Sequence, residues 1–132
     1  MPLQLVVVTP ERKVVKTEAD EVQLPGSEGY LGILPGHAPL ITLLKTGVLS
    51  YRGGGRSGAY AVSTGFAEIL DDRVSVLADS AQGSGEIDAA AAERERAKAE
   101  EEMKTAGVDT LDDARARAEL ATAQLEVARR PA

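Results

Sequence analysis

Apolar and polar residues alternate through the first two thirds of the chain. In Glu21–Leu24, valine and leucine alternate with glutamate and glutamine, whereas Leu3–Val8 and Leu40–Leu44 are short and mostly apolar runs. Alternation with a period of two, or an apolar run of four to eight residues between turn signals, is typical of β-strands. The pattern predicts eight or nine short strands, among residues 3–8, 13–16, 21–24, 30–34, 40–44, 47–52, 59–63, 66–70 and 74–78.

Turn residues join several of these strands. Gly53–Arg56 reads GGGR and lies between the sixth and seventh segments, and Asp71–Arg73 lies between the last two. Glycine and aspartate readily adopt the backbone conformations that tight turns require. Short strands joined in this way predict a flattened antiparallel β-sandwich or barrel.

The pattern changes abruptly after residue 82, where alanine, glutamate and arginine begin to dominate. These residues have high helix propensity. Gly107 is a natural stop within this stretch, so we expect two helices. Thr110, with Asp113 three residues later, has the pattern of an N-cap and predicts the start of the second helix.

Two unlike parts follow from these patterns, and the predicted fold class is α+β. Residues 1–84 are expected to form the β-sandwich or barrel, and residues 85–132 an antiparallel α-helical hairpin. The glycine-rich segment Gly83-Ser84-Gly85 is the expected joint between them.

The predicted helices share a seam, most of it alanine, at spacings of three and four, which is the pattern of packed helix pairs. Its members are Ala92, Arg96, Ala99, Met103 and Ala106 in the first helix and Leu111, Ala114, Ala118, Ala121, Leu125 and Ala128 in the second. An alanine contributes much less than the roughly 1.5–3 kcal/mol of a fully buried leucine. We therefore expect a hairpin that opens, or leaves the β part, at modest cost. A static appendage is the other interpretation, and composition does not choose between them.

Composition excludes several classes of function. The 132 residues include no cysteine, so disulfides and thiolate metal sites are excluded. The formal net charge of −6 argues against nucleic acid or an anionic membrane surface as the partner. The longest apolar runs are too short to span a bilayer, so no membrane insertion is expected. We expect a soluble chain that begins at or near Met1 without a targeting segment.

Candidate catalytic motifs are weak. Gly53–Gly58 satisfies G-x-G-x-x-G, but a dinucleotide site needs a helix after the motif and a strand is predicted there. His37 is the only histidine, which leaves too few ligands for a metal site. Asp71 and Asp72 fit a turn better than an acid–base pair. We expect no enzyme activity, no metal and no cofactor.

A run dense in glycine and proline distinguishes the chain. Gly26–Leu40 reads GSEGYLGILPGHAPL, with four glycines and two prolines that hold a loop in one shape. This string resembles the signature loop of the epsilon subunits of bacterial-type, H⁺-transporting F-type ATP synthases. Leu5–Glu11, Thr46-Gly47, Gly65-Phe66 and Val74–Asp79 also resemble that family in order, as does the Ala118–Ala121 segment.

The resemblance implies a non-catalytic rotor subunit of the central stalk. In the family, the β domain binds the gamma subunit and the c-ring, and couples ring rotation to gamma. In bacterial relatives the hairpin is a switch, which extends toward the catalytic alpha and beta subunits and inhibits ATP hydrolysis. The implied position is peripheral, on the cytoplasmic face of the bacterial inner membrane, with the chloroplast thylakoid as the other setting.

Site residues follow from the resemblance by position. The implied c-ring surface comprises Thr9, Glu28, Gly29, Tyr30, Gly32 and His37. An acidic residue stands at position 30 in some relatives, so ring contact here is expected to rest on Glu28 and on packing of Tyr30. The implied contacts with the catalytic subunits are Arg115, Arg117, Arg129 and Arg130.

Some relatives bind regulatory ATP through a motif Ile/Leu-Asp-x-x-Arg-Ala. Ile87, Asp88 and Ala92 match it, but Ala91 stands where the arginine belongs. A missing guanidinium removes bidentate phosphate binding, so we expect weak or absent ATP binding.

An alternative function from a different class is a free-standing β-sandwich binding module with a helical dimerisation tail. The Gly26–Leu40 string favours the rotor subunit, because a generic sandwich has no need of it.

Overall fold

The computed structural model describes residues 2–130 and contains ten strands, one 3₁₀ turn and two helices. The elements are β1 (Leu3–Val8), β2 (Lys13–Ala19), β3 (Glu21–Gly26), β4 (Gly29–Ile33), β5 (Leu40–Leu44), β6 (Gly47–Gly53), β7 (Arg56–Val62), β8 (Gly65–Leu70), β9 (Arg73–Ala78), β10 (Ala81–Gly83), η1 (Ser84–Glu86), α1 (Ala89–Thr105) and α2 (Val108–Arg129). The predicted fold class, a β-sandwich or barrel followed by a helical hairpin, is confirmed.

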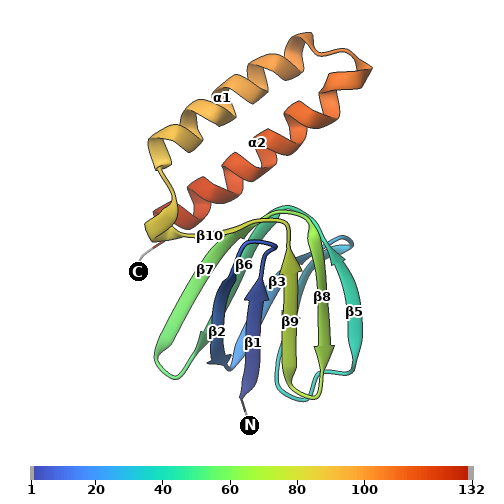
Figure 1. The fold of residues 1–132 in the computed structure, drawn as a ribbon, viewed down its shortest axis with the longest axis vertical. Coiled ribbons are helices and arrows are strands. Elements are labelled where there is room, and N and C mark those ends of the chain that lie inside the picture. The colour runs from blue at the N-terminus through green and yellow to red at the C-terminus, as the bar shows by residue number, and fades with distance from the viewer. Residues whose placement is uncertain (1, 131–132) are drawn as a thin grey trace.

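The strands form one strongly curled sheet in the order β10-β7-β6-β3-β5-β8-β9-β1-β2, with β4 paired to β3 (Figure 1). Neighbours are antiparallel except β1 and β9, which are parallel. These two strands lie far apart in the sequence, so no short hairpin constrains their direction.

Aliphatic side chains fill the interior of the curled sheet. The largest fully buried side chains of this core are Leu3, Leu5, Leu24, Ile33, Leu49 and Ile69, and valines from four strands pack among them. Alternate positions of each strand point inward, which accounts for the period of two in the sequence.

The strands run closer to their turns than the sequence pattern predicted. Gly53 pairs with Arg56, so the loop expected at 53–56 is a two-residue turn at Gly54 and Gly55, with φ of 60° and 76°. Asp71 and Asp72, with φ of 51° and 60°, form the equivalent turn between β8 and β9. Two-residue turns with positive φ match the right-handed twist of the flanking strands.

The sandwich has two ends, and the register identifies which loops share each one. Gly26 pairs with Leu44, which pairs with Gly65, at the end that also carries β10 and the helices. We call this the helix end. Leu40 pairs with Ile69 near the opposite end, which we call the far end. Figure 1 shows the helices lying across the helix end, with α2 between α1 and the sheet.

The first helix has a side-chain cap. The Oδ1 atom of Asp88 accepts a hydrogen bond from the Ala91 N–H at 3.0 Å and caps α1.

The second helix begins earlier than predicted. The N-cap of α2 is Gly107, so Thr110 lies inside the first turn and its prediction as the cap was wrong. The backbone N–H of Thr110 already bonds to the Gly107 carbonyl, because the connection between the helices is too short to leave a loop.

The seam between the helices forms largely as predicted, with Ala92, Ala99, Ala114, Ala121 and Leu125 buried. The α2 helix has a second buried face that the seam pattern does not include. Its Ala123 and Val127 pack against Val48 and Ala61 on the outer side of β6 and β7. This small contact attaches the hairpin to the sandwich.

Replacement of Gly65 by alanine is expected to destabilise the sandwich. A Cβ at this position would overlap the carbonyl oxygen of Leu77 and lie 2.8 Å from the Ala78 Cα, so the β8–β9 backbone would have to shift. We expect a loss of about 1–3 kcal/mol, the usual cost of overpacking. Denaturant unfolding of the full chain measures it. Gly85→Ala is the control, because space around Gly85 is open. Equal stability of the two variants would contradict this packing argument.

Candidate protein-interaction surfaces

The β3–β4 turn at the helix end carries three of the residues predicted to contact a c-ring. Glu28 is exposed and Gly29 has a φ of 130°, which favours glycine. Tyr30 is 57% exposed, while its hydroxyl oxygen accepts a hydrogen bond from the Val48 N–H at 3.0 Å. The phenol is therefore held in place at one tip and presents its ring face to solvent.

Two other predicted residues lie away from this turn. Gly32 is the next-to-last residue of β4, the strand that follows the turn, and lies opposite Gln23. His37 is in the loop between β4 and β5 at the far end, where the Gly36 N–H donates to the Asp72 Oδ1 at 2.7 Å. The length of β5, roughly 15 Å, separates His37 from Glu28. The structure therefore does not bring His37 together with the β3–β4 turn.

Thr9 is at the helix end but is buried, with 6% of its surface exposed. Its hydroxyl is 3.3 Å from the carbonyl oxygen and from the N–H of Arg12, and its own N–H donates to the Arg12 carbonyl at 2.9 Å. Thr9 thus closes the turn between β1 and β2.

A broad exposed apolar surface covers the outer side of β5, β8, β9 and the end of β1. We call it the apolar face; its members are the exposed Ile41, Leu43, Phe66, Leu70 and Leu77 and the half-buried Val8. Leu43 pairs with Phe66, which pairs with Leu77, which pairs with Val8, so one row crosses four strands. Ile41 is 70% exposed and Leu43 67%. Contiguous apolar surface of this kind marks an interaction site.

A hollow of about 540 Å³ lies where the apolar face meets the helix end. It is lined by Val8, Thr9, Pro10, Thr64, Gly65, Phe66, Leu77, Ala78 and Asp79. Sequence reasoning did not identify the apolar face. The signal available was Leu40–Leu44, a strand that is apolar on both sides although only one side faces the core.

The four arginines predicted to contact catalytic subunits all have acidic neighbours within the hairpin. Arg117 spans the helices: it pairs with Glu95 at 3.0 Å and with Glu102 on α1, and with Asp113 at 3.1 Å on its own helix. These carboxylates raise the pKa of Arg117 above its ordinary value, with Glu102 the largest contributor.

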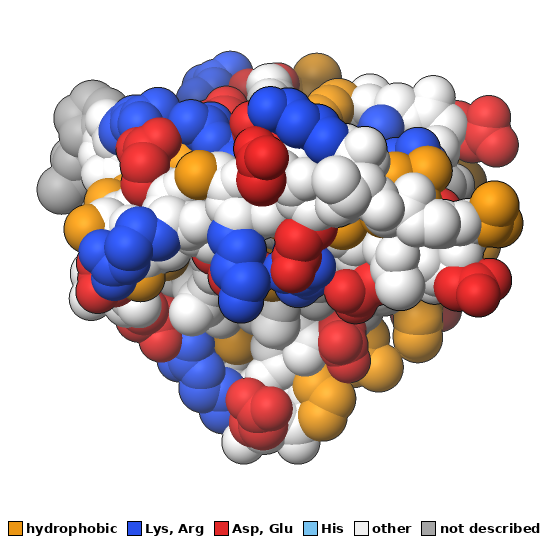
Figure 2. Space-filling model, turned by 90° about the horizontal axis from the view of Figure 1, so that it is seen from above, with side chains coloured by type: hydrophobic (Ala, Val, Ile, Leu, Met, Phe, Trp, Pro, Cys, Tyr) orange, Lys and Arg blue, Asp and Glu red, His pale blue; other side chains and the backbone are white. Residues whose placement is uncertain are grey.

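The other three arginines are more exposed. Arg129 pairs with Glu93 of α1 at 3.1 Å, while Arg115 and Arg130 pair with Asp112 and Glu126 of their own helix. Figure 2, which views the molecule from the helix side, shows basic and acidic side chains interspersed over this surface.

The residues that match the ATP motif have structural roles. Ile87 packs against the cluster that joins α2 to the sheet, Asp88 caps α1, and Ala92 is buried between the helices. Nearby, the Nε2 atom of Gln124 donates to the Oε1 atom of Gln82 at 2.5 Å, so this amide is occupied in joining α2 to β10. These residues do not fit a nucleotide phosphate.

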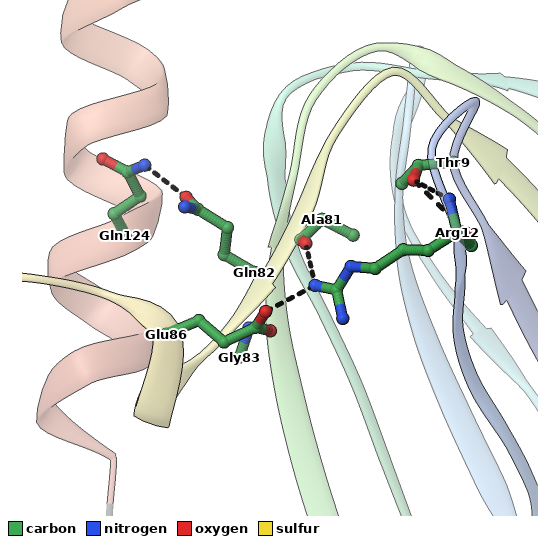
Figure 3. A network of polar contacts seen from close by, with 7 residues as sticks. All are labelled: Thr9, Arg12, Ala81, Gln82, Gly83, Glu86 and Gln124. Carbon is green, nitrogen blue, oxygen red and sulfur yellow. Dashed lines mark hydrogen bonds and ion pairs between the residues drawn. The ribbon is translucent and has the colours of Figure 1, made fainter.

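A compact polar network surrounds the joint between β10 and the helices (Figure 3). The Nη2 atom of Arg12 donates to the Ala81 carbonyl at 3.3 Å and to Glu86 Oε2 at 2.6 Å. The Oε1 atom of Glu86 accepts from the Gly83 N–H at 3.0 Å. The Gly83 N–H, followed by Arg12, holds the pKa of Glu86 below its ordinary 4.5, so this carboxylate is ionised at neutral pH.

Among residues 2–130, no helix combines the length and the apolar character needed to cross a membrane.

Comparison with known proteins agrees with the fold and its sequence signature. The family model for the β-sandwich domain of the ATP synthase delta/epsilon chain matches residues 2–84. The ATP synthase epsilon chain of Herpetosiphon aurantiacus is 47% identical over 131 residues, covering 98% of this chain and 96% of the relative. That of Myxococcus xanthus is 41% identical over 127 residues, covering 96% and 91%. The chain belongs to the ATP synthase epsilon-chain family, as the resemblance of Gly26–Leu40 predicted.

Solved structures share the fold. A chain of the Euglena gracilis mitochondrial ATP synthase, solved as an OSCP/F1/c-ring assembly, aligns with a TM-score of 0.85 at 21% identity. The alignment covers 98% of this chain and 82% of that chain. A chain of the Tetrahymena thermophila central stalk and c-ring aligns over 65% of this chain and 69% of that chain, with a TM-score of 0.55 at 15% identity.

Proposed function

We propose that this chain is a rotor subunit of the central stalk of a bacterial F-type ATP synthase. Its β-sandwich joins the gamma subunit to the c-ring, and its hairpin regulates ATP hydrolysis. The observation that carries the proposal is the apolar face, because a chain of this family that leaves such a surface in solvent requires a partner to cover it.

The gamma subunit is the partner assigned to the apolar face. The row Leu43, Phe66, Leu77 and Val8 offers large aliphatic and aromatic side chains on a rigid sheet. The adjacent hollow gives one side chain of the partner a place to insert. Buried anchors of this kind supply most of the free energy of binding in protein interfaces.

The c-ring is the partner assigned to the β3–β4 turn. Glu28 supplies charge and polar contacts, and Tyr30 supplies a flat ring surface. Gly47 supports this arrangement, because a Cβ there would lie 2.8 Å from both the Tyr30 hydroxyl and the Pro25 Cβ. The absence of a side chain at Gly47 therefore allows the tyrosine to reach its hydrogen bond with Val48. His37 lies too far from this turn to share a compact contact with it.

The hairpin is the proposed regulatory element, because a small contact holds it to the sandwich. The cluster of Val48, Ala61, Ala123 and Val127 contains two alanines and two valines, with Ile87 beside it. At about 0.8 kcal/mol for each buried CH₂, these side chains give a docking free energy far below that of the sandwich core. Release therefore leaves the sandwich folded.

Release of the hairpin brings its arginines within reach of acidic segments on the catalytic alpha and beta subunits. Arg115, Arg129 and Arg130 are exposed already, and their ion pairs are weak because they are solvated. Arg117 becomes available only when α1 and α2 separate, because Glu95 and Glu102 hold it between the helices. We place the subunit on the cytoplasmic face of the inner membrane, with no role for bound ATP.

Phe66→Asp is expected to weaken binding to the gamma subunit by at least about tenfold, because a charge would be buried at the centre of the interface. Calorimetry with purified gamma measures the dissociation constant. The matched control is Ser57→Asp, which adds the same charge at an exposed position on β7, away from the apolar face. If Phe66→Asp bound gamma as tightly as the control, the assignment of this face would be wrong.

Suppression of ATP hydrolysis is expected to require the helices. A catalytic complex that lacks this subunit would be supplied with the full chain or with a chain ending after Glu86, which keeps the contacts of Arg12. Both should bind, and only the full chain should lower the hydrolysis rate. Equal suppression by the shorter chain would overturn the regulatory role of residues 87–132.

A further inference from the structure

The glycine-rich joint is held to the sandwich on both sides. On its N-terminal side, β10 pairs with β7, with Ala81 opposite Val62 and Gly83 opposite Tyr60. The Ser80 N–H donates to the Ser63 hydroxyl at 2.8 Å just before this strand. From its sequence, Gly83-Ser84-Gly85 is the natural hinge, yet these contacts restrain the segment that leads into it.

Arg12 completes the restraint from a different element. One guanidinium nitrogen reaches the Ala81 carbonyl before the glycines and the Glu86 carboxylate after them. Glu86 also turns back to accept from the Gly83 N–H, which closes the 3₁₀ turn on itself. Arg12 belongs to the β1–β2 turn, whose shape Thr9 fixes through its hydroxyl and backbone. The joint is therefore bound to a rigid part of the sandwich.

The character of the contacts changes after Glu86. Ile87 is in extended conformation, with φ of −100° and ψ of 127°, and its side chain packs on the same small cluster that docks α2. Asp88 caps the helix that it begins, so its polar contact moves with the hairpin. Once α2 separates from this cluster, the described residues provide only weak contacts between residues 87 and 88 and the sandwich.

We propose that Arg12 clamps residues 81–86 to the sandwich, so that the released hairpin pivots at Ile87-Asp88 and not at Gly83-Ser84-Gly85. This inference rests on the proposed release of the hairpin. The clamp sets the reach of the hairpin: freeing residues 81–86 would lengthen the tether by about 20 Å. A shorter tether limits the positions that the helices can reach and raises their effective concentration at one target.

Hydrogen exchange on the full-length chain, followed by mass spectrometry, tests the Arg12 clamp while the hairpin is docked. Arg12→Gln should speed exchange of the 81–86 amides by about three- to tenfold, because it removes a charge-assisted bond that spans the joint. Arg52→Gln is the matched control, since Arg52 forms another exposed ion pair of the sandwich, with Glu21 at 2.7 Å. Unchanged exchange at 81–86 in Arg12→Gln would overturn the proposal.

A variant in which the hairpin is released tests the position of the pivot. Val127→Asp places a charge in the docking cluster and should speed exchange across α2 while residues 81–86 remain as protected as in the unaltered chain. Adding Arg12→Gln to Val127→Asp should speed both regions. If Val127→Asp alone freed residues 81–86, the pivot would lie at the glycines and the clamp would be refuted. If it left α2 unaffected, easy release of the hairpin would be refuted, and the Arg12→Gln result would still decide the clamp.

Discussion

The contact between α2 and the outer side of β6 and β7 determines how this molecule can behave. Four small side chains form its centre, whereas the interior of the sandwich is filled by aliphatic residues from all ten strands. Hydrophobic stabilisation scales with the apolar area that is buried. We therefore expect the proposed release of the hairpin to leave the sheet folded. A larger contact would make the helices a permanent layer of the fold.

Two sets of polar contacts divide the motion of the hairpin into separate steps. The Arg12 network acts at the joint, whereas Arg117 acts between the helices through Glu95 and Glu102. Because the two sets share no residue, the hold of Arg12 on the joint does not depend on the contact that Arg117 makes between the helices. The β1–β2 turn also links two regions: Thr9 and Pro10 line the hollow beside the apolar face, and Arg12 holds the joint. A partner seated in the hollow would touch the turn that holds the joint.

Structural elements that depend on residues close together in the chain could be predicted from the sequence. Period-two alternation located the strands, and Leu40–Leu44 matches β5 at both ends. The spacing of alanines identified the seam of the hairpin. Thr110 failed as a cap, because an N-cap pattern is a local preference and the short connection at Gly107 began the helix earlier.

Features that depend on long-range packing were not predictable in the same way. The docking face of α2 rests on Ala123 and Val127, and two residues of ordinary type give no periodic signal. The apolar face became visible only when the register placed Leu43, Phe66 and Leu77 side by side. Likewise, Arg12 and Glu86 are 74 positions apart. The candidate c-ring residues came from a resemblance, and position in a sequence did not reveal that His37 and Glu28 lie at opposite ends.

A reversible crosslink between the hairpin and the sandwich would show whether the hairpin must leave the sandwich to inhibit hydrolysis. Gln82 and Gln124 meet across the docked interface, and the chain has no cysteine, so cysteines at these two positions can be joined selectively by a short reducible crosslinker. The quantity to measure is ATP hydrolysis by the assembled complex before and after reduction. We expect uninhibited hydrolysis with the crosslink in place and inhibition once it is cleaved. Equal inhibition in both states would show that the hairpin acts without leaving the sandwich.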